Sequence, residues 1–300
     1  MSHTPAPAFS GAGREASRNT PEGFLTVGDV VRLVEDAAPS DLAASWDSNG
    51  LICGDPADPV QSILLAVDPV TTVVDEALSS GVDMVITHHP LYLRGTDCVA
   101  ATDPKGRSIH RLVRAGIALL NAHTSLDAAH GGVAEALADR VGLTSTVPLE
   151  PDPVSPDQGI GRIGTLVQPI TLRQLATDVA AALPDSAPGL LVGGDLDAVV
   201  ERIAVSGGAG DSLLQQAREA GADVFLTADL RHHPASEHLE NGRPYLLCGT
   251  HWATEWVGLP PLAQRLEEDA RSCGASLKVQ VSHIVTDPWV LRLSTGSDRA

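Results

Sequence analysis

The sequence predicts an α/β protein with two lobes, mixed or parallel sheets flanked by helices, and a dinuclear metal site between the lobes. From residue 62 to 141, apolar runs alternate with amphipathic segments, a pattern that implies strand–helix–strand units and parallel strands. A stretch rich in Pro and Gly, 152–161, separates this region from a second alternating region. Histidines and carboxylates follow several predicted strands, where α/β sheets place their functional groups.

The first predicted helix starts at Thr26 and ends before Pro39, because the valines after Thr26 recur on one helical face. The segment 45–51 then reads as a loop with Asn-Gly turn chemistry. Within it, Trp46 has two interpretations, a plug for an apolar gap or part of a functional loop. Further along, the pattern predicts strands at 62–67, 82–87 and 116–121, and helices at 71–80, 105–115 and 132–141.

The second region follows the same logic and closes the chain with strands. Its predicted strands are 162–167, 189–192, 202–206, 224–227, 244–248, 277–285 and 289–293, and its helices are 172–183, 212–220 and 259–271. Gly207-Gly208-Ala209-Gly210 has two interpretations, a phosphate cradle or a tight strand-to-helix turn. We expect a disordered tail over 1–22, a metal-binding lobe over 23–150 plus 249–300, and a second lobe over 151–248.

Composition excludes several classes of protein. With a formal net charge of −18, the chain is a poor partner for nucleic acid, because phosphate binding needs a basic face. We expect no partnership with membranes, since no apolar run approaches the length of a membrane span. The four cysteines form no C-x-x-C pair, which indicates reduced thiols and a cytoplasmic protein.

Five nitrogen and oxygen donors stand just after predicted strands. An apolar strand stops at His88 and His89, Asp127 follows another strand, and His251 and Glu255 are spaced to share one helical face. These donors exceed what one tetrahedral zinc needs, and they suit two divalent ions roughly 3.5–4 Å apart. The donor set leaves zinc, iron(II), manganese and cobalt open; zinc is our first expectation, with iron or manganese as alternatives.

Four motifs resemble the signatures of the GTP cyclohydrolase 1 type 2 homologues, also called the NGG-interacting-factor-three-like proteins. They are Ser45–Leu51, Ile86–Leu91, Ala122–Ala128 and Gly249–Glu255. Three glycine-containing stretches, 131–133, 159–164 and 207–210, also resemble stretches of this family. The resemblance runs from about Gly23 to Trp289. It departs from the family pattern at Thr250, which is inserted before the histidine, and at Ser125, which replaces an asparagine. The short linker near Gly159 implies that the inserted domain of longer members is absent.

The resemblance implies a two-lobed fold, two metal ions on the same five ligands, a small-molecule substrate and a homohexamer. It further implies hydrolysis of a nucleotide or another small heterocyclic or phosphorylated compound. For such chemistry His123 is our candidate catalytic residue, and His232 or His233 is a further candidate for proton transfer. Arg94, Arg162 and Arg231 are candidates for phosphate contact. The alternative function is a metal-binding or metal-delivery protein without turnover.

Overall fold

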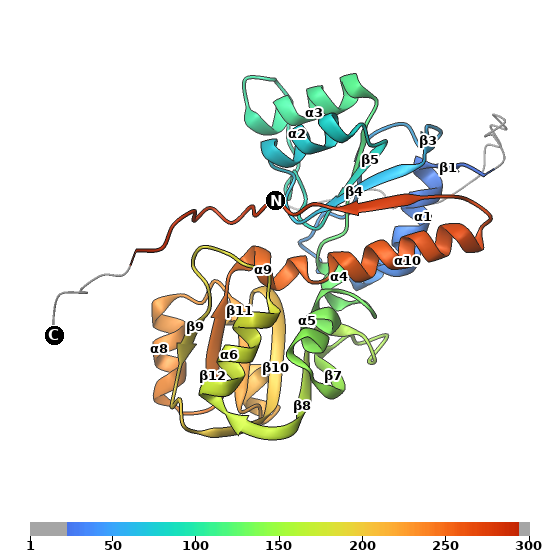
Figure 1. Cartoon of the computed structure of the whole chain (residues 1–300). Coiled ribbons are helices and arrows are strands. Elements are labelled where there is room, and N and C mark those ends of the chain that lie inside the picture. Colours follow the sequence, from blue (N-terminus) through green and yellow to red (C-terminus); the bar gives the residue numbers. More distant parts are fainter. Residues whose placement is uncertain (1–22, 294–300) are drawn as a thin grey trace.

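Two sheets flanked by helices form the computed structural model, which describes residues 23–293 (Figure 1). The expected disordered tail over 1–22 lies outside the described residues. None of the helices within 23–293 is long and apolar enough to cross a membrane. A short two-stranded ribbon, β1 (Leu25–Thr26) with β3 (Pro59–Val60), accompanies the first sheet.

The first sheet has the strand order β13-β4-β5-β6-β2, and four of its five strands are parallel. Only β2 runs antiparallel, against β6. The predicted strands and helices of this region are present with small shifts at their ends, whereas β2 was not predicted and begins within the stretch 45–51 expected to be a loop. The elements are β2 (Gly50–Cys53), β4 (Ser62–Ala66), β5 (Met84–Thr87), β6 (Ala118–Asn121), β13 (Lys278–Val281), α1 (Val27–Ala37), η1 (Ser40–Leu42), α2 (Thr71–Ser80), α3 (Pro104–Ala115) and α10 (Leu259–Ser272).

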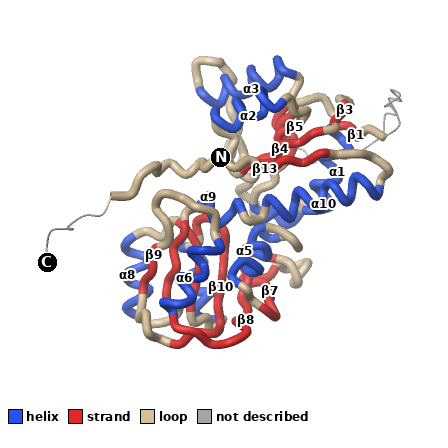
Figure 2. The backbone as a smooth tube through the Cα atoms, in the orientation of Figure 1, coloured by secondary structure: helices blue, strands red, loops and turns tan. Residues whose placement is uncertain are grey.

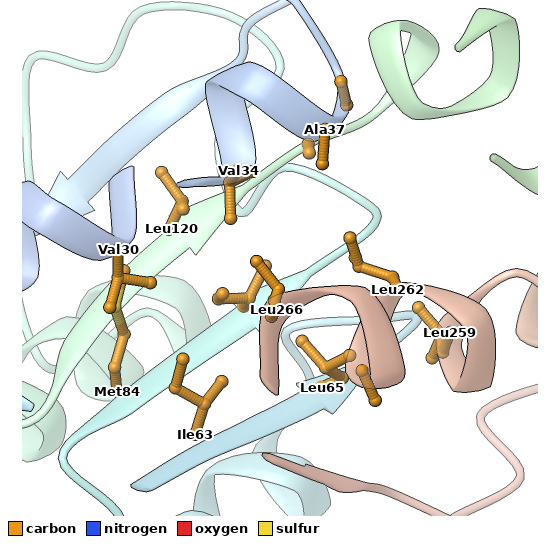
Figure 3. Close-up of a cluster of buried hydrophobic side chains, with 14 of the residues drawn as sticks. Val30, Val34, Ala37, Ile63, Leu65, Met84, Leu120, Leu259, Leu262 and Leu266 are labelled. Carbon is orange, nitrogen blue, oxygen red and sulfur yellow. The ribbon is translucent and has the colours of Figure 1, made fainter. Parts of the chain in front are cut away.

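Alternating side chains let this sheet bury both faces. Ile63 and Leu65 of β4 pack with α1 and α10, as Figure 3 shows, whereas Leu64 and Ala66 point to α2 and α3. A strand covered by helices on both sides is apolar at every position, because successive side chains point to opposite faces. The continuous apolar runs of the sequence therefore identified these strands.

The second sheet has the order β7-β8-β10-β11-β12-β9 and is mixed. Strands β10, β11 and β12 are parallel, and β7, β8 and β9 pair antiparallel with their neighbours. Its elements are β7 (Thr144–Pro151), β8 (Gly159–Thr171), β9 (Leu191–Gly193), β10 (Val199–Ala209), β11 (Val224–Ala228), β12 (Tyr245–Gly249), α5 (Val133–Val141), α6 (Leu172–Ala182), η2 (Asp211–Leu213), α7 (Leu214–Glu219), α8 (His232–Glu240) and α9 (His251–Trp256). Figure 2 shows α6 and α8 on opposite sides of these strands.

Two sequence expectations are wrong, and one helix was not expected. The stretch 152–161 is mainly the turn of a β7–β8 hairpin within one sheet, with β8 already starting at Gly159. Residues 289–293 form no strand; they belong to an extended arm that leaves the body of the protein (Figure 1). Helix α8 was not predicted, because its His-, Glu- and Pro-containing sequence has a weak apolar periodicity.

Candidate metal centre

Loops at the carboxyl ends of parallel strands from both sheets meet at one place. In the first sheet, His88 and His89 follow β5, and the short helix α4 (Thr124–Ala128) after β6 carries Asp127. In the second sheet, the turn after β12 leads into α9, which carries His251 and Glu255. Thr250 caps α9 by accepting a hydrogen bond from the Ala253 N–H.

The structure brings all five predicted donors together. His88 Nε2 lies 3.6 Å from Asp127 Oδ1 and 3.5 Å from Glu255 Oε1. His251 Nε2 lies 2.9 Å from Glu255 Oε1 and 3.2 Å from His89 Nε2, which is 3.1 Å from Glu255 Oε2. Two ligands on one ion, each bonded at about 2.0–2.2 Å, are separated by similar distances. The donor set therefore fits a divalent cation without rearrangement of the backbone.

Each histidine of the cluster has its Nδ1 held by an oxygen. The partners are the backbone oxygen of Ala122 for His88 (3.1 Å), Asp68 for His89 (2.7 Å), Asp47 for His123 (2.7 Å) and Asp229 for His251 (2.6 Å). When the Nδ1–H donates to this oxygen, the Nε2 of a neutral ring is left to bind a cation. Histidines that bind metals commonly have such an oxygen partner, which fixes the tautomer and the ring orientation.

Three buried atoms at the centre have no hydrogen-bond partner within residues 23–293. They are His88 Nε2, Asp127 Oδ1 and Glu255 Oε2. A buried polar atom without a partner costs free energy, so several such atoms at one point call for an explanation. A cation bound by these lone pairs provides one.

The charges of the cluster shift the pKa values strongly. Burial alone would lower the pKa of both His89 and His251, but the neighbouring carboxylates, with Glu255 first among them, raise these values to about 11 and about 9. Burial raises the pKa of Asp127. Burial would do the same to Glu255, but the charges of His88 and His89 hold the pKa of Glu255 well below its usual range.

His123, the candidate catalytic residue, stands at the edge of this cluster. One of its ring nitrogens lies within 4.8 Å of ring nitrogens of His88 and His89. Trp46 packs edge-on against its ring, with centroids 5.9 Å apart, so this Trp contacts the site. Asp47 also accepts hydrogen bonds from the backbone N–H and the hydroxyl of Thr124, which tie the loop to α4.

The glycine run of the second region approaches the donors rather than cradling an anion. Gly207, Gly208 and Ala209 belong to β10, and the Gly208 N–H already donates to Thr254 Oγ1 at 3.0 Å. A Cβ at Gly208 would lie 2.3 Å from Glu255 Oε1. The phosphate-cradle interpretation is therefore wrong, because Gly208 makes room for the carboxylate of Glu255. The tight-turn interpretation holds at Gly210, which links β10 directly to η2.

The other candidates from sequence lie outside the cluster. Arg162 is buried in an ion pair with Glu135, at 3.0 Å, and donates to the carbonyl of Ala128, so it fastens α4 to β8. Arg94 is exposed, and so is Arg231, which pairs with Asp211. His232 and His233 are exposed at the start of α8.

Two carboxylates that hold histidines of the site, Asp47 and Asp229, were not predicted in that role from the sequence. Asp47 was visible only as part of a loop motif, and Asp229 was not singled out. Asp229 directly follows β11, so the rule that placed the other donors after strand ends could have found it. It adopts a positive φ of 53°, a conformation that Asp tolerates better than most residues.

A cavity of about 390 Å³ borders the centre on the side of His89 and His251. Its walls come from both halves of the chain and from the arm after β13, and they include Asp68, Asp229 and Trp289. The donors on that side are therefore accessible to a small molecule, whereas His88 and Glu255 are buried.

Comparison with known proteins gives a consistent result. A model of the Duf34/NIF3 (NGG1p interacting factor 3) family matches residues 25–288. A Streptomyces coelicolor protein named GTP cyclohydrolase 1 type 2 homolog is 46% identical over 269 residues, which cover 89% of this chain and 94% of that protein. The fold matches a Bacillus cereus protein related to NIF3 (TM-score 0.83, 24% identity, 89% of this chain and 99% of that chain). It also matches a hypothetical protein of Staphylococcus aureus (TM-score 0.81, 27% identity, 88% and 98%).

Proposed function

Because the chain belongs to the Duf34/NIF3 family, as its motifs predicted, we propose that it is a metal-dependent hydrolase of a nucleotide or another small heterocyclic compound. The observation that carries this proposal is the convergence of five nitrogen and oxygen donors beside an open cavity, with His123 at the edge of the cluster. The relatives' name, GTP cyclohydrolase 1 type 2 homolog, is consistent with a hydrolytic reaction.

In this proposal each chain holds two divalent ions, with zinc as the first choice. His88, His89, Asp127, His251 and Glu255 would hold these ions, and Glu255 lies next to both groups of donors. The support is that Glu255 oxygens lie 3.5 Å or less from a nitrogen of each of the three histidines. When bound, such a pair supplies Lewis acidity and lowers the pKa of water in contact with it.

In this proposal the side chain that transfers a proton in the reaction is His123. Its Nδ1–H donates to Asp47, whose pKa is well below its usual range because, despite burial, hydrogen bonds from His123 and Thr124 favour the carboxylate. The carboxylate holds the ring in the tautomer whose Nε2 can accept a proton. Asp47 is therefore a positioning residue that acts through His123.

An assay of formate release from GTP and from a panel of other nucleotides tests the proposal. We expect turnover in the metal-loaded protein and a loss of about 100-fold in kcat for Asp47→Asn, with metal content unchanged. Asp41→Asn, at an exposed position on the preceding 3₁₀ turn, is the matched control and should keep full activity. A change in metal content rather than in kcat would instead make Asp47 a residue of the metal site.

The rival function is metal delivery without turnover. It predicts fast, reversible transfer of the bound ion to a metal-free acceptor, and no product from any nucleotide. That pair of results would replace the hydrolase by a metal-delivery protein. We further propose a cytoplasmic location and no nucleic-acid or membrane partner, because the chain combines its acidic charge with free cysteines.

A further inference from the structure

The cavity beside His89 and His251 has a wall formed by the arm that follows β13. Thr286 Oγ1 donates to Asp68, the carboxylate that orients His89. Asp287 Oδ1 accepts from the backbone N–H of Trp252, at 3.4 Å. Two residues further along, Trp289 lines the same cavity. The arm is thus fixed against both halves of the metal centre, and Thr286, Asp287 and Trp289 would contact a ligand in the cavity.

The charge of this cavity is negative. Asp68, Asp229 and Asp287 line it, and among residues 23–293 no Lys or Arg does. Two divalent ions would bring four positive charges, whereas six carboxylates surround them and the cavity: Asp47, Asp68, Asp127, Asp229, Glu255 and Asp287. The balance stays negative even with both ions bound, which disfavours a chain of phosphates in this space.

The same walls suit a planar ring with N–H groups. Trp289 has 68% of its surface exposed, so its ring is available for stacking. Asp287 Oδ2 is buried and has no hydrogen-bond partner among the described residues, so it can accept an N–H from a ligand. We propose that the cavity binds a planar, uncharged or cationic heterocycle without a phosphate chain, stacked on Trp289 and hydrogen-bonded to Asp287.

This inference rests on the proposed function in one respect: it assumes that the reaction takes place at the metal centre, at one end of the cavity. Lys105 is a control position, because this positive side chain lines a separate hollow of about 360 Å³ that also borders Asp68 and His89. Arg292 is a second control, since it lies on the arm close to Gly189 but does not line the cavity.

Calorimetric titration of the metal-loaded protein with guanine, guanosine, GMP and GTP tests the proposal. We expect affinity to fall as phosphates are added, with guanosine binding about tenfold or more tightly than GTP. Trp289→Ala should weaken guanosine binding about tenfold, while Trp289→Phe keeps most of it. Asp287→Asn should reduce the difference in affinity between guanosine and GTP. Lys105→Ala and Arg292→Ala should leave the order of affinities of the four compounds unchanged.

Three results would overturn the inference. They are GTP binding as tightly as guanosine or more so, loss of GTP binding in Lys105→Ala, and no binding of guanine or guanosine at millimolar concentration. Metal content and formate release measured on the same samples separate this outcome from failure of the proposed function. A hydrolase that prefers GTP would refute the inference alone, whereas a protein that binds guanosine without turnover would refute the hydrolase alone.

Discussion

At the scale of single residues, Glu255 lies between His88 on one side and His89 with His251 on the other. Its carboxylate lies 3.5 Å from His88 Nε2, 3.1 Å from His89 Nε2 and 2.9 Å from His251 Nε2. Among the described residues of the cluster, no other side chain lies this close to all three imidazoles. Removing its charge should therefore affect both ions together, whereas loss of a single histidine should affect mainly one.

Glu255→Gln is accordingly expected to reduce the metal content from about two ions per chain to less than one. Elemental analysis of protein purified without chelators measures this. Glu240→Gln, at the exposed end of α8, makes the same chemical change at a residue outside the donor cluster and should keep both ions. If the Glu255 variant retained two ions, the shared-ligand arrangement would be wrong.

The raised pKa values of His89 and His251 predict that metal binding releases protons. With values of about 11 and about 9, both imidazoles carry a proton at pH 7 in the metal-free protein, and a cation must displace it. We expect release of about two protons per chain at pH 7 and an apparent affinity that rises from pH 7 to pH 9. Calorimetry in buffers of different ionisation enthalpy counts these protons, and a count near zero would contradict the expectation.

The same shifts fix the sign of the stability change in the metal-free protein. A pKa raised by folding adds stability that is fully present below the unfolded value, roughly 6.5 for His, and is lost as pH rises through the folded value. Thermal unfolding of the metal-free protein should therefore show falling stability from about pH 7 upward, through the pKa of His251 near 9 and then that of His89 near 11.

At the scale of elements, strand β10 is built to let α9 approach. Gly208 has φ of +62°, and a Cβ there would meet Glu255 Oε1 at 2.3 Å and His251 Nε2 at 3.1 Å. We expect Gly208→Ala to destabilise the protein by more than the roughly 1–2 kcal/mol that the left-handed conformation costs a residue with a side chain, and to lower the metal content.

Gly221→Ala is the matched control for that variant. Gly221 has a similar φ of +72°, but nothing lies within 4 Å of the position its Cβ would take. In chemical denaturation, Gly221→Ala should lower the free energy of unfolding only by the cost of the left-handed conformation, and the variant should keep its metal. Equal effects of the two substitutions would mean that the contact with Glu255 is unimportant.

The sequence predicted the elements whose apolar pattern is strong and missed those that depend on distant partners. The strand β5 and the helix α2 were found nearly to the residue, because buried runs and helical spacing are local signals. Strand β2 was not predicted, and its first two residues were read as part of a loop, because its pairing with β6 supplies a stability that its own sequence does not display. Residues 289–293 were read as a strand because their apolar side chains are typical of one, although no strand among residues 23–293 pairs with them.

The site was more predictable than the fold around it, but only for residues with a recognisable chemistry. Histidines after strand ends pointed to the cluster directly. By contrast, Arg162 looked like a phosphate ligand and is instead buried against Glu135, because nothing in a sequence distinguishes an arginine that bridges two elements from one that faces solvent.

At the scale of the whole molecule, the arm after β13 carries several exposed apolar side chains close together in the sequence. Val290 is 90% exposed, Leu291 68% and Leu293 75%. Strand β9, at the edge of the second sheet, adds Leu191, which is 61% exposed, and leaves one side of its backbone unpaired within the described chain. Apolar patches and free sheet edges of this kind are commonly covered by another copy of the chain.

We therefore expect a closed homo-oligomer in solution, with the hexamer implied by the family resemblance as the specific prediction. Light scattering should give a mass several times the 31.1 kDa of one chain. Replacing Val290, Leu291 and Leu293 together by Asp should lower that mass, because burying three carboxylates in an apolar contact is costly. Val154→Asp, at an exposed valine in the β7–β8 turn, adds a charge away from the arm and should leave the assembly intact. A mass of one chain for the unmodified protein, with or without added metal, would show that the arm has no partner copy.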